Sequence, residues 1–280
     1  MILANTLDSV LARIAAEVEG VPAVWAIHEP VDWRKFMEKF GLGVLESCAR
    51  IFHSSGPMVY VSEELRTLYP ANQSFVIPNR LPSWEPHAPS SPQDRLSAKQ
   101  RLGFGEGVLV VVVGIVGLRK RPHDVIQAVQ HLNLRGIPIE LAIVGDFEPG
   151  ESAYVAQLRR AAADGHVRLT GRVPDATPFF QAADILVLAS SNESFSLVVL
   201  EAMAHGVAIV ATPVFAKELL VPGTECLLFD VGDIVALEGH LAKLALDQEL
   251  REAIGRAGWF HYRQLTTFEE QVAAYGELLK

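Results

Sequence analysis

Unbroken apolar runs are the feature that most constrains the fold of this chain. The clearest are VLVVVV at residues 108–113 and ILVLA at residues 185–189. Neither run alternates apolar with polar residues, so each predicts a strand buried on both faces, as in a parallel sheet covered by helices. Helical patterns separate such runs almost throughout the chain, which favours βαβ units. The predicted fold class is therefore α/β.

The overall composition excludes several classes of protein. The chain has 280 residues, of which 50% are hydrophobic, and this is enough for two globular domains. A net charge of −9 argues against nucleic acid as a partner. The two cysteines, Cys48 and Cys226, are far apart and are expected to be free buried thiols in a reducing cytoplasm.

The sequence carries no targeting or membrane-spanning pattern. The segment MILANTLDSV at the start lacks the basic and apolar regions of a signal peptide, and no apolar run approaches the ~18 residues of a membrane span. We expect a cytoplasmic protein. Peripheral contact with the inner face of a membrane stays open, because a local amphipathic patch can outweigh the total charge.

The alternation divides the chain into two unequal parts. Residues 1–80 are expected to form a partial Rossmann-like domain with two or three strands, either supported by the second domain or lacking an upstream piece. The segment 81–94 contains four prolines and three serines, which is typical of a linker. Residues 95–260 are expected to form a doubly wound, Rossmann-like domain, and residues 261–280 a helix that packs back on the first part. The strands are predicted at 22–27, 58–61, 108–113, 139–144, 167–170, 185–190, 207–211 and 226–229, and the main helices at 6–19, 33–50, 122–134, 151–164, 195–205, 233–246 and 248–257.

Two glutamates bracket an apolar stretch in NESFSLVVLEAMAHG, residues 192–206. A buried strand leads through a short polar turn into a helix, and this arrangement places free amides at the usual ligand crevice of an open α/β sheet. These amides and the helix dipole attract phosphate. Glu193 lies at the rim and Glu201 in the second helical turn, where a carboxylate accepts hydrogen bonds from hydroxyls. The alternative is that neither glutamate binds a ligand: Glu193 is then favoured only by the helix dipole, and Glu201 faces solvent. The turn and its amides comprise Ser194, Phe195, Ser196 and Leu197.

A second cluster follows the strand at 108–113. The strand ends at Gly114, and the loop behind it carries Arg119, Lys120 and Arg121. Three cations at the carboxyl end of a strand are suited to a diphosphate; an ordinary solvated loop is the alternative. A G-x-G-x-x-G fingerprint is missing, which disfavours a nicotinamide cofactor.

Other strand ends carry weaker signals. His28 and Glu29 close the strand at 22–27 and are expected to face the same cleft. Glycine-bearing turns in AIVGDFEPG and VRLTGRVPD let the backbone approach a flat ligand such as a base. No D-x-D, H-E-x-x-H, paired C-x-x-C or G-x-S-x-G motif occurs, so neither a metal site nor a hydrolase nucleophile is evident.

Together these stretches resemble the retaining glycosyltransferases of family 4, or group 1, which have the GT-B fold. The resemblance rests on the E-x7-E element ESFSLVVLE, preceded by GIVGLRKRPHD, AIVGD and VRLTGRVPD and followed by ELLVPGTECLLFDVGD. It covers residues 95–280 well and 1–80 more loosely. Family members often have Gly-Arg where this chain has Gly114-Ile115, so Arg119 is the expected substitute. The family's first domain also begins with further βα units, which leaves the acceptor side incomplete here.

The resemblance implies a role for each site residue. Glu201 would hold the ribose, Glu193 the transferring sugar, and Lys120 with the amides of residues 195–197 the diphosphate. The turns Gly145–Asp146 and Arg172–Val173 would flank the base, and His28 would lie near the reacting sugar. Gly114 and Arg119 complete the predicted donor site.

The function implied is transfer of a sugar from a UDP-, GDP- or ADP-sugar to an unknown acceptor hydroxyl, with retained configuration and without a metal or other cofactor. Three alternatives stay open: a donor-binding module or subunit that needs a partner chain or second copy to complete the first domain, a GT-B sugar-nucleotide epimerase, and, more distantly, a dehydrogenase.

Overall fold

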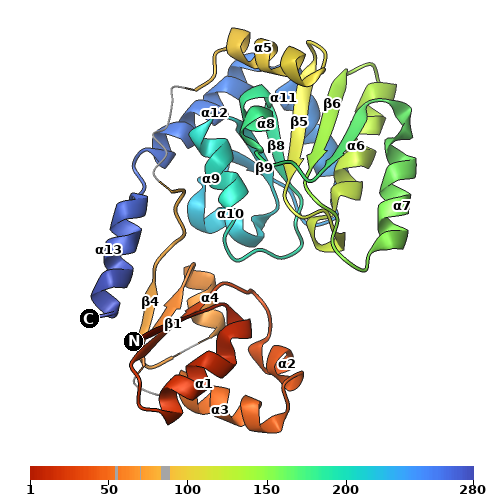
Figure 1. The fold of residues 1–280 in the computed structure, drawn as a ribbon. Helices are drawn as coiled ribbons and strands as arrows, with labels where there is room; N and C mark the ends of the chain where they lie inside the picture. Colours follow the sequence, from red (N-terminus) through yellow and green to blue (C-terminus); the bar gives the residue numbers. More distant parts are fainter. Residues whose placement is uncertain (54–55, 70, 83–88) are drawn as a thin grey trace. The chain divides into compact units, whose positions relative to one another are not determined.

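The computed structural model describes residues 1–280 except 54–55, 70 and 83–88, and divides into two compact units. The first unit consists of Met1–Ser83, Glu193–Leu197 and Thr266–Lys280, and the second of Trp84–Asn192 and Val198–Leu265. Each unit is built on its own parallel sheet (Figure 1). In the described part of the chain, no helix has both the length and the apolar character needed to cross a bilayer.

The first unit has a four-stranded parallel sheet in the order β1-β2-β3-β4. Alternate residues of β2 serve different layers, as the pleat requires. Trp25 and Ile27 pack in a core with the helices on one face, whereas Val24 and Ala26 pack against the C-terminal helix α13 on the other. The elements are β1 (Ile2–Asn5), α1 (Val10–Val18), β2 (Ala23–Ile27), α2 (Trp33–Glu38), α3 (Leu42–Phe52), β3 (Met58–Tyr60), α4 (Glu63–Leu68), β4 (Ser74–Val76) and α13 (Phe268–Leu278).

The sequence-based assignment of this unit needs three corrections. The helix predicted at 33–50 is two helices, because Gly41 between them has φ 94° and ψ 165°, a non-helical conformation that suits glycine, and it stands immediately before the first residue of α3. Strand β1 lies in a segment predicted without structure, and α4 was also missed. The sheet therefore has four strands rather than two or three.

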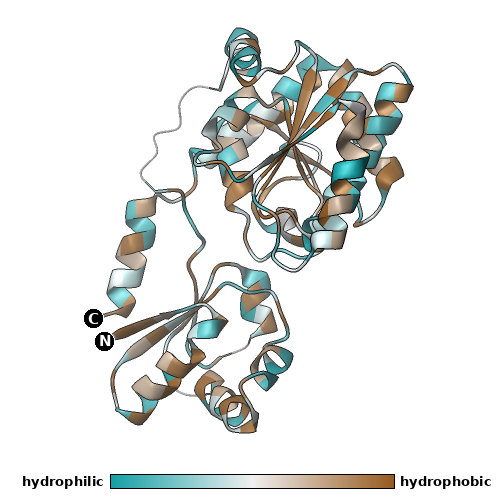
Figure 2. Cartoon of the chain, turned by 45° about the vertical axis from the view of Figure 1, so that its right-hand side comes forward, coloured by the Kyte–Doolittle hydropathy of each residue, from teal (hydrophilic) through white to brown (hydrophobic). Residues whose placement is uncertain are grey.

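The second unit has a six-stranded parallel sheet in the order β10-β9-β8-β5-β6-β7. Every residue of β5 from Leu109 to Val113 is buried, which confirms the prediction from the run VLVVVV. Helices α6, α7 and α11 pack with β5, β6 and β8 in one large core. Figure 2 shows the strands of this unit as a brown centre, with helices of mixed teal, white and brown around them. The strands are β5 (Val108–Val113), β6 (Ile139–Val144), β7 (Val167–Gly171), β8 (Ile185–Leu188), β9 (Ala208–Ala211) and β10 (Cys226–Leu228).

The helices of this unit match the predicted segments closely, with three additions. Helix α5 starts at Pro92, inside the predicted linker 81–94, where Ser91 and Asp94 form a capping box. Residues 83–88 of that linker lie outside the described residues. Helices α8 and α10 were missed because both are short. The helices are α5 (Pro92–Leu102), α6 (Pro122–Leu134), α7 (Ser152–Ala161), α8 (Thr177–Ala182), α9 (Leu197–Ala204), α10 (Pro213–Leu219), α11 (Ile234–Leu246) and α12 (Gln248–Tyr262).

Candidate functional site

The strand order of the second unit creates one topological switch point. From β5 the chain moves outward through β6 to β7 and then returns to β8, on the opposite side of β5. Loops after β5 and β8 therefore diverge at the carboxyl ends of adjacent strands, which is where open α/β sheets bind ligands. The two chemistry-bearing stretches predicted from the sequence are these two loops.

The backbones of the loops after β5 and β6 are in direct contact. The N–H of Gly114 donates to the carbonyl oxygen of Val144 (2.9 Å), and a Cβ atom on Gly145 would lie 1.9 Å from the Gly114 oxygen. Both glycines have positive φ, 126° and 143°. Only glycine fits this approach at position 145, and residue 114 is also glycine, so these two positions form a side-chain-free floor at the sheet edge.

Lys120 lies above this floor. It ends a 3₁₀ turn (Leu118–Lys120), and its Nζ atom is 3.8 Å from the position that a Cβ on Gly114 would occupy. The ammonium is thereby placed at the carboxyl end of β5, beside the switch point. A point charge at this position is suited to a phosphate group.

Arg119 joins the loop after β5 to the loop after β8. Its Nη1 donates to the carbonyl oxygen of Asn192 (2.7 Å), and its own carbonyl oxygen accepts from the N–H of Ser191 (2.9 Å). The Arg119 side chain is exposed. Its position ties together the two loops that flank the switch point, a role the sequence did not reveal.

Arg121 is not directed like its two basic neighbours. Its guanidinium forms a bidentate ion pair with Asp124, with Nε–Oδ2 at 2.6 Å and Nη2–Oδ1 at 3.1 Å. Asp124 is 1% exposed. The expectation that all three cations face a diphosphate therefore needs correction for Arg121. The spacing of three residues from Arg121 to Asp124 was visible in the sequence, but the two side chains meet through the left-handed backbone of Arg121, which the sequence did not reveal.

The loop after β6 supports the cationic loop from the other side. The N–H of Val116 donates to the carbonyl oxygen of Asp146 (2.8 Å), and a Glu151 oxygen accepts from the N–H of Leu118 (2.9 Å). Asp146 is exposed and caps its own turn through the N–H of Phe147. Of the predicted base-flanking residues, Gly145 and Asp146 thus lie beside the cationic loop. Arg172 and Val173 follow β7, which is one of the two edge strands of the sheet.

Glu201 lies in α9, and burial of its side chain together with the charge of Asp175 raises its pKa to about 7. Asp175 in turn accepts a hydrogen bond from the N–H of Thr177 (2.9 Å). A glutamate with a raised pKa at a crevice is a candidate binding group. The contribution of Asp175 was not expected from the sequence.

The segment before α9 belongs to the first unit. Phe195 packs against the aromatic core of that unit, and Glu193 and Ser196 are buried, at 8% and 3% exposure. The Ser196 hydroxyl has no hydrogen-bond partner among the described residues. Ser194 is half-buried and Leu197 is 44% exposed.

His28 follows β2 in the first unit. Its Nε2 lies 2.8 Å from the side-chain oxygen of Asn5, and its backbone N–H donates to Glu29. Burial lowers the pKa of His28, and the nearby charge of Glu29 opposes this shift only in part. The imidazole is therefore neutral at pH 7. Across the described residues there is no group of three or more acidic, histidine or cysteine side chains arranged to hold a metal ion.

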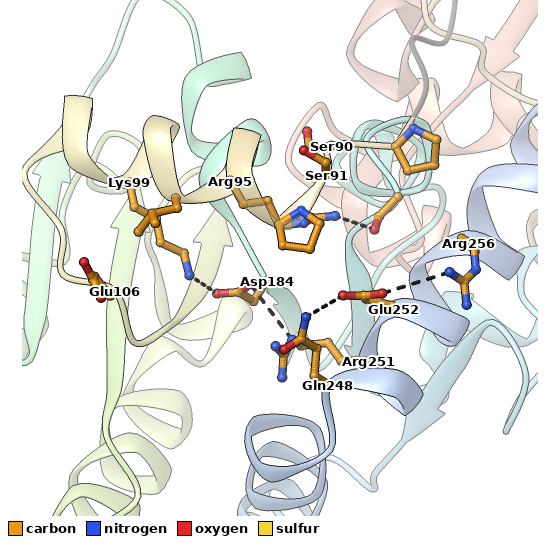
Figure 3. Close-up of a pocket in the computed structure, with 14 residues that line it drawn as sticks. Ser90, Ser91, Arg95, Lys99, Glu106, Asp184, Gln248, Arg251, Glu252 and Arg256 are labelled. Carbon is orange, nitrogen blue, oxygen red and sulfur yellow. Dashed lines mark hydrogen bonds and ion pairs between the residues drawn. The ribbon is translucent and has the colours of Figure 1, made fainter.

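A cavity of about 490 Å³ lies at the opposite, amino-terminal edge of the second sheet (Figure 3). The cationic side chains that line it bind backbone carbonyls or carboxylates of the fold itself. Arg95 donates to the carbonyl oxygens of Ala183 and Gly206, which follow α8 and α9, and Arg251 donates to Leu244 in the last turn of α11.

A third cation of this cavity, Lys99, pairs with buried Asp184 at 2.5 Å, and the fourth, Arg256, lies 4.0 Å from a carboxylate oxygen of Glu252. Helix carboxyl ends carry partial negative charge, so Arg95 and Arg251 neutralise them. The cavity is structural rather than a second ligand site.

Comparisons with known proteins identify the family and the fold. The profile of the group 1 glycosyl transferases matches residues 107–247. The chain belongs to this family.

Among individual relatives, O-antigen chain mannosyltransferase B of Escherichia coli is 28% identical over 249 residues, which cover 86% of this chain and 64% of that protein. D-inositol 3-phosphate glycosyltransferase of Xylanimonas cellulosilytica is 32% identical over 222 residues, 71% of this chain and 51% of that one. The chain thus spans between half and two thirds of the length of these relatives.

Solved structures give the same fold. The Anabaena protein HepE, in complex with UDP and glucose, superimposes with a TM-score of 0.85 at 21% identity, covering 99% of this chain and 77% of that one. Sucrose-phosphate synthase from Thermosynechococcus elongatus gives 0.79 at 20% identity, over 99% of this chain and 72% of that one. The fold is GT-B, with two Rossmann-like sheets.

Proposed function

We propose that this protein transfers a sugar from a nucleoside-diphosphate sugar to an acceptor hydroxyl, with the configuration at the anomeric carbon retained. The observation that carries the proposal is the position of the Lys120 ammonium above Gly114, at the switch point between β5 and β8. A side-chain-free floor with a lysine above it accommodates a diphosphate, and Glu201 supplies an acceptor for ribose hydroxyls.

In the proposed reaction the bond between the anomeric carbon and the diphosphate breaks, and the electron pair remains on the diphosphate. Lys120 and the amides of Phe195, Ser196 and Leu197 stabilise the charge that develops there, which is the kind of interaction that contributes most to catalysis. The acceptor oxygen attacks from the face that the diphosphate leaves, and its proton passes to a phosphate oxygen. Glu193 orients the sugar, and neutral His28 contacts it.

The remaining residues of the site complete the donor pocket in this proposal. Arg119 places a second cation near the diphosphate, and the turns at Gly145–Asp146 and Arg172–Val173 flank the base. Protein cations take the role that a divalent metal has in other sugar transferases, so we propose a metal-independent reaction. The donor-binding module and the epimerase are not favoured, because the relatives that match carry the names of sugar transferases and a synthase.

Nucleotide binding is the first test, because it needs no acceptor. UDP is the first candidate, since the HepE structures contain UDP and UDP-glucose; GDP and ADP follow. Titration calorimetry on the wild type, K120A and E201A should show roughly 10- to 100-fold weaker binding for each variant, because each loses a charged hydrogen bond. R256A, at the opposite edge of the sheet, is the control and should bind as the wild type does. Equal affinities in all four proteins would show that the site is assigned wrongly.

Product analysis then separates the candidate functions. NMR of the sugar formed from UDP-glucose and simple acceptors reports the anomeric configuration. An inverted product would contradict retention, binding without any turnover would support the donor-binding module, and an altered sugar without acceptor would support an epimerase. Activity that disappears with a chelator and returns with a divalent cation would contradict metal independence.

A further inference from the structure

The residue after Lys120 has an unusual backbone. Arg121 has φ 50° and ψ 42°, the left-handed conformation, and in the described part of the chain only one other non-glycine residue, Thr6, has positive φ. This conformation costs a side-chain-bearing residue roughly 1–2 kcal/mol. Pro122 follows and disfavours the right-handed helical conformation at residue 121. Arg121 thus makes the sharp turn between the 3₁₀ turn that ends at Lys120 and the first residue of α6.

The Arg121 side chain compensates for this strain. Both carboxylate oxygens of Asp124 accept from its guanidinium, at 2.6 and 3.1 Å. Asp124 is itself buried in the first turn of α6, so the pair is anchored to the helix. Bidentate pairs of this kind are geometrically specific as well as strong.

Asp124 is held from its other side too. His123 Nε2 lies 3.2 Å from the Asp124 carboxylate, and His123 Nδ1 lies 2.6 Å from the Tyr154 hydroxyl on α7. Burial and the charge of Arg121 lower the pKa of His123, against the opposing charge of Asp124. The chain of contacts thus runs from α7 through His123 and Asp124 to the turn at Arg121.

We propose that Arg121 and Asp124 are positioning residues, which set the location of the Lys120 ammonium without touching the donor. The inference rests on the proposed function, because Lys120 is assigned there to the diphosphate. The ion pair holds residue 121 in the left-handed conformation, and this fixes the direction in which the preceding residue leaves the 3₁₀ turn. Without the pair, Arg121 relaxes toward an extended conformation and the ammonium moves away from Gly114.

A double-mutant cycle tests whether the pair acts through Lys120. The probe is the tightest binder among UDP, GDP and ADP, titrated into the wild type, D124N, K120A and the double variant K120A/D124N. In the Lys120 background D124N should weaken binding about tenfold, since displacement of a binding group by about 1 Å can cost up to about 100-fold. In the K120A background the same change should have less than about a twofold effect. An equal loss in both backgrounds would overturn the proposal.

A second pair of variants separates the backbone role from direct phosphate binding. R121A and R121G both remove the guanidinium, but glycine adopts φ 50° without strain and alanine does not. We expect R121G to retain most of the affinity and R121A to lose about tenfold, at matched melting temperatures or after correction for the unfolded fraction. Equal losses in R121A and R121G, with D124N unaffected, would mean that Arg121 contacts the phosphate itself and would also overturn the proposal.

The same experiments distinguish failure of the proposed function from failure of the positioning role alone. If the wild type binds none of the three nucleotides, the donor site is wrong and the inference falls with it. If the wild type binds and K120A weakens binding, but the cycle is additive, the donor site stands and only the positioning role is wrong. R256A, which removes an arginine at the amino-terminal edge of the sheet, is again the control and should bind nucleotide as the wild type does.

Discussion

A Cβ atom on Gly145 would lie 1.9 Å from the carbonyl oxygen of Gly114, closer than any side chain tolerates. The two glycines end adjacent strands of the second sheet, and both have positive φ. G145A should therefore push the loops after β5 and β6 apart, lower the free energy of unfolding by about 2–4 kcal/mol and abolish nucleotide binding.

Thermal melting and nucleotide titration measure these effects. G150A is the matched control, because Gly150 in the same loop also has positive φ (89°) but has open space around it. Its cost should be only about 1 kcal/mol, from backbone strain alone, with binding kept. A G145A protein that binds nucleotide normally would contradict the close approach.

Glu201 should make donor binding depend on pH. Its pKa of about 7 in the free protein is raised by burial and by Asp175, and two ribose hydroxyls that donate to the carboxylate would lower it again. Binding then favours the ionised form, so affinity rises with pH, by about tenfold between pH 6 and 8.

UDP-glucose is the suitable probe, because its diphosphate does not titrate in this range. E201Q cannot ionise and should give a flat profile. Without ligand, the raised pKa of Glu201 also affects stability. The contribution of Glu201 to the free energy of unfolding falls as the pH rises from its pKa in the unfolded chain toward 7. E201Q removes this dependence on pH as well. A wild-type affinity that is flat with pH or falls would exclude the ribose role.

The ion pair of Lys99 and Asp184 should matter for stability and not for binding. Both side chains are buried, and Asp184 also accepts from the N–H of Leu109 at 2.7 Å. D184A leaves the Lys99 charge buried without its carboxylate partner, which typically costs about 3–5 kcal/mol. Denaturant unfolding should show this loss. The folded fraction should keep wild-type nucleotide affinity, because the pair lies at the amino edge of the sheet; a large loss of affinity would implicate the cavity of Figure 3 in donor binding.

Two helical glycines should respond in opposite directions to substitution by alanine. Gly239 in α11 has no heavy atom near its Cβ position, so G239A should raise the free energy of unfolding by about 0.5–1 kcal/mol. In α12, a Cβ on Gly255 would lie 2.2 Å from the carbonyl oxygen of Gly206, so G255A should destabilise by about 2–3 kcal/mol. Urea titrations of both variants compare them directly. Equal effects would mean that α12 does not approach the turn at Gly206 this closely.

Long elements with strong periodicity were predictable, and short ones were not. The apolar run of β5 and the helical spacing of α6 predicted both elements with their observed bounds. Strand β1 and helices α8 and α10 have four to seven residues, too few for a period to show. The break at Gly41 had a signal, a glycine inside a helical pattern. Such glycines are often tolerated, and only the φ of 94° shows that this one separates two helices.

The two segments that form the candidate site were predictable from the sequence, but the positions and partners of their side chains were not. The sequence pointed to Lys120, in the polar loop after one buried strand, and to Glu201, in the helix that follows another. It grouped Arg121 with the other cations, because charge alone does not reveal that a buried Asp124 binds this side chain. It also gave no indication that Glu201 is buried enough to raise its pKa to about 7.

The sequence by itself determined the α/β alternation, the strands buried on both faces and the identity of the charged and glycine residues at their ends, because these follow from local periodicity and from which side chains avoid water. Only the tertiary structure decided the strand order that makes β5 and β8 neighbours, since hydrogen bonds between parallel strands are made by backbone groups that every sequence shares. It also decided that Arg121 turns to Asp124 while Lys120 lies over Gly114, because the left-handed backbone at residue 121 redirects the chain between these two side chains.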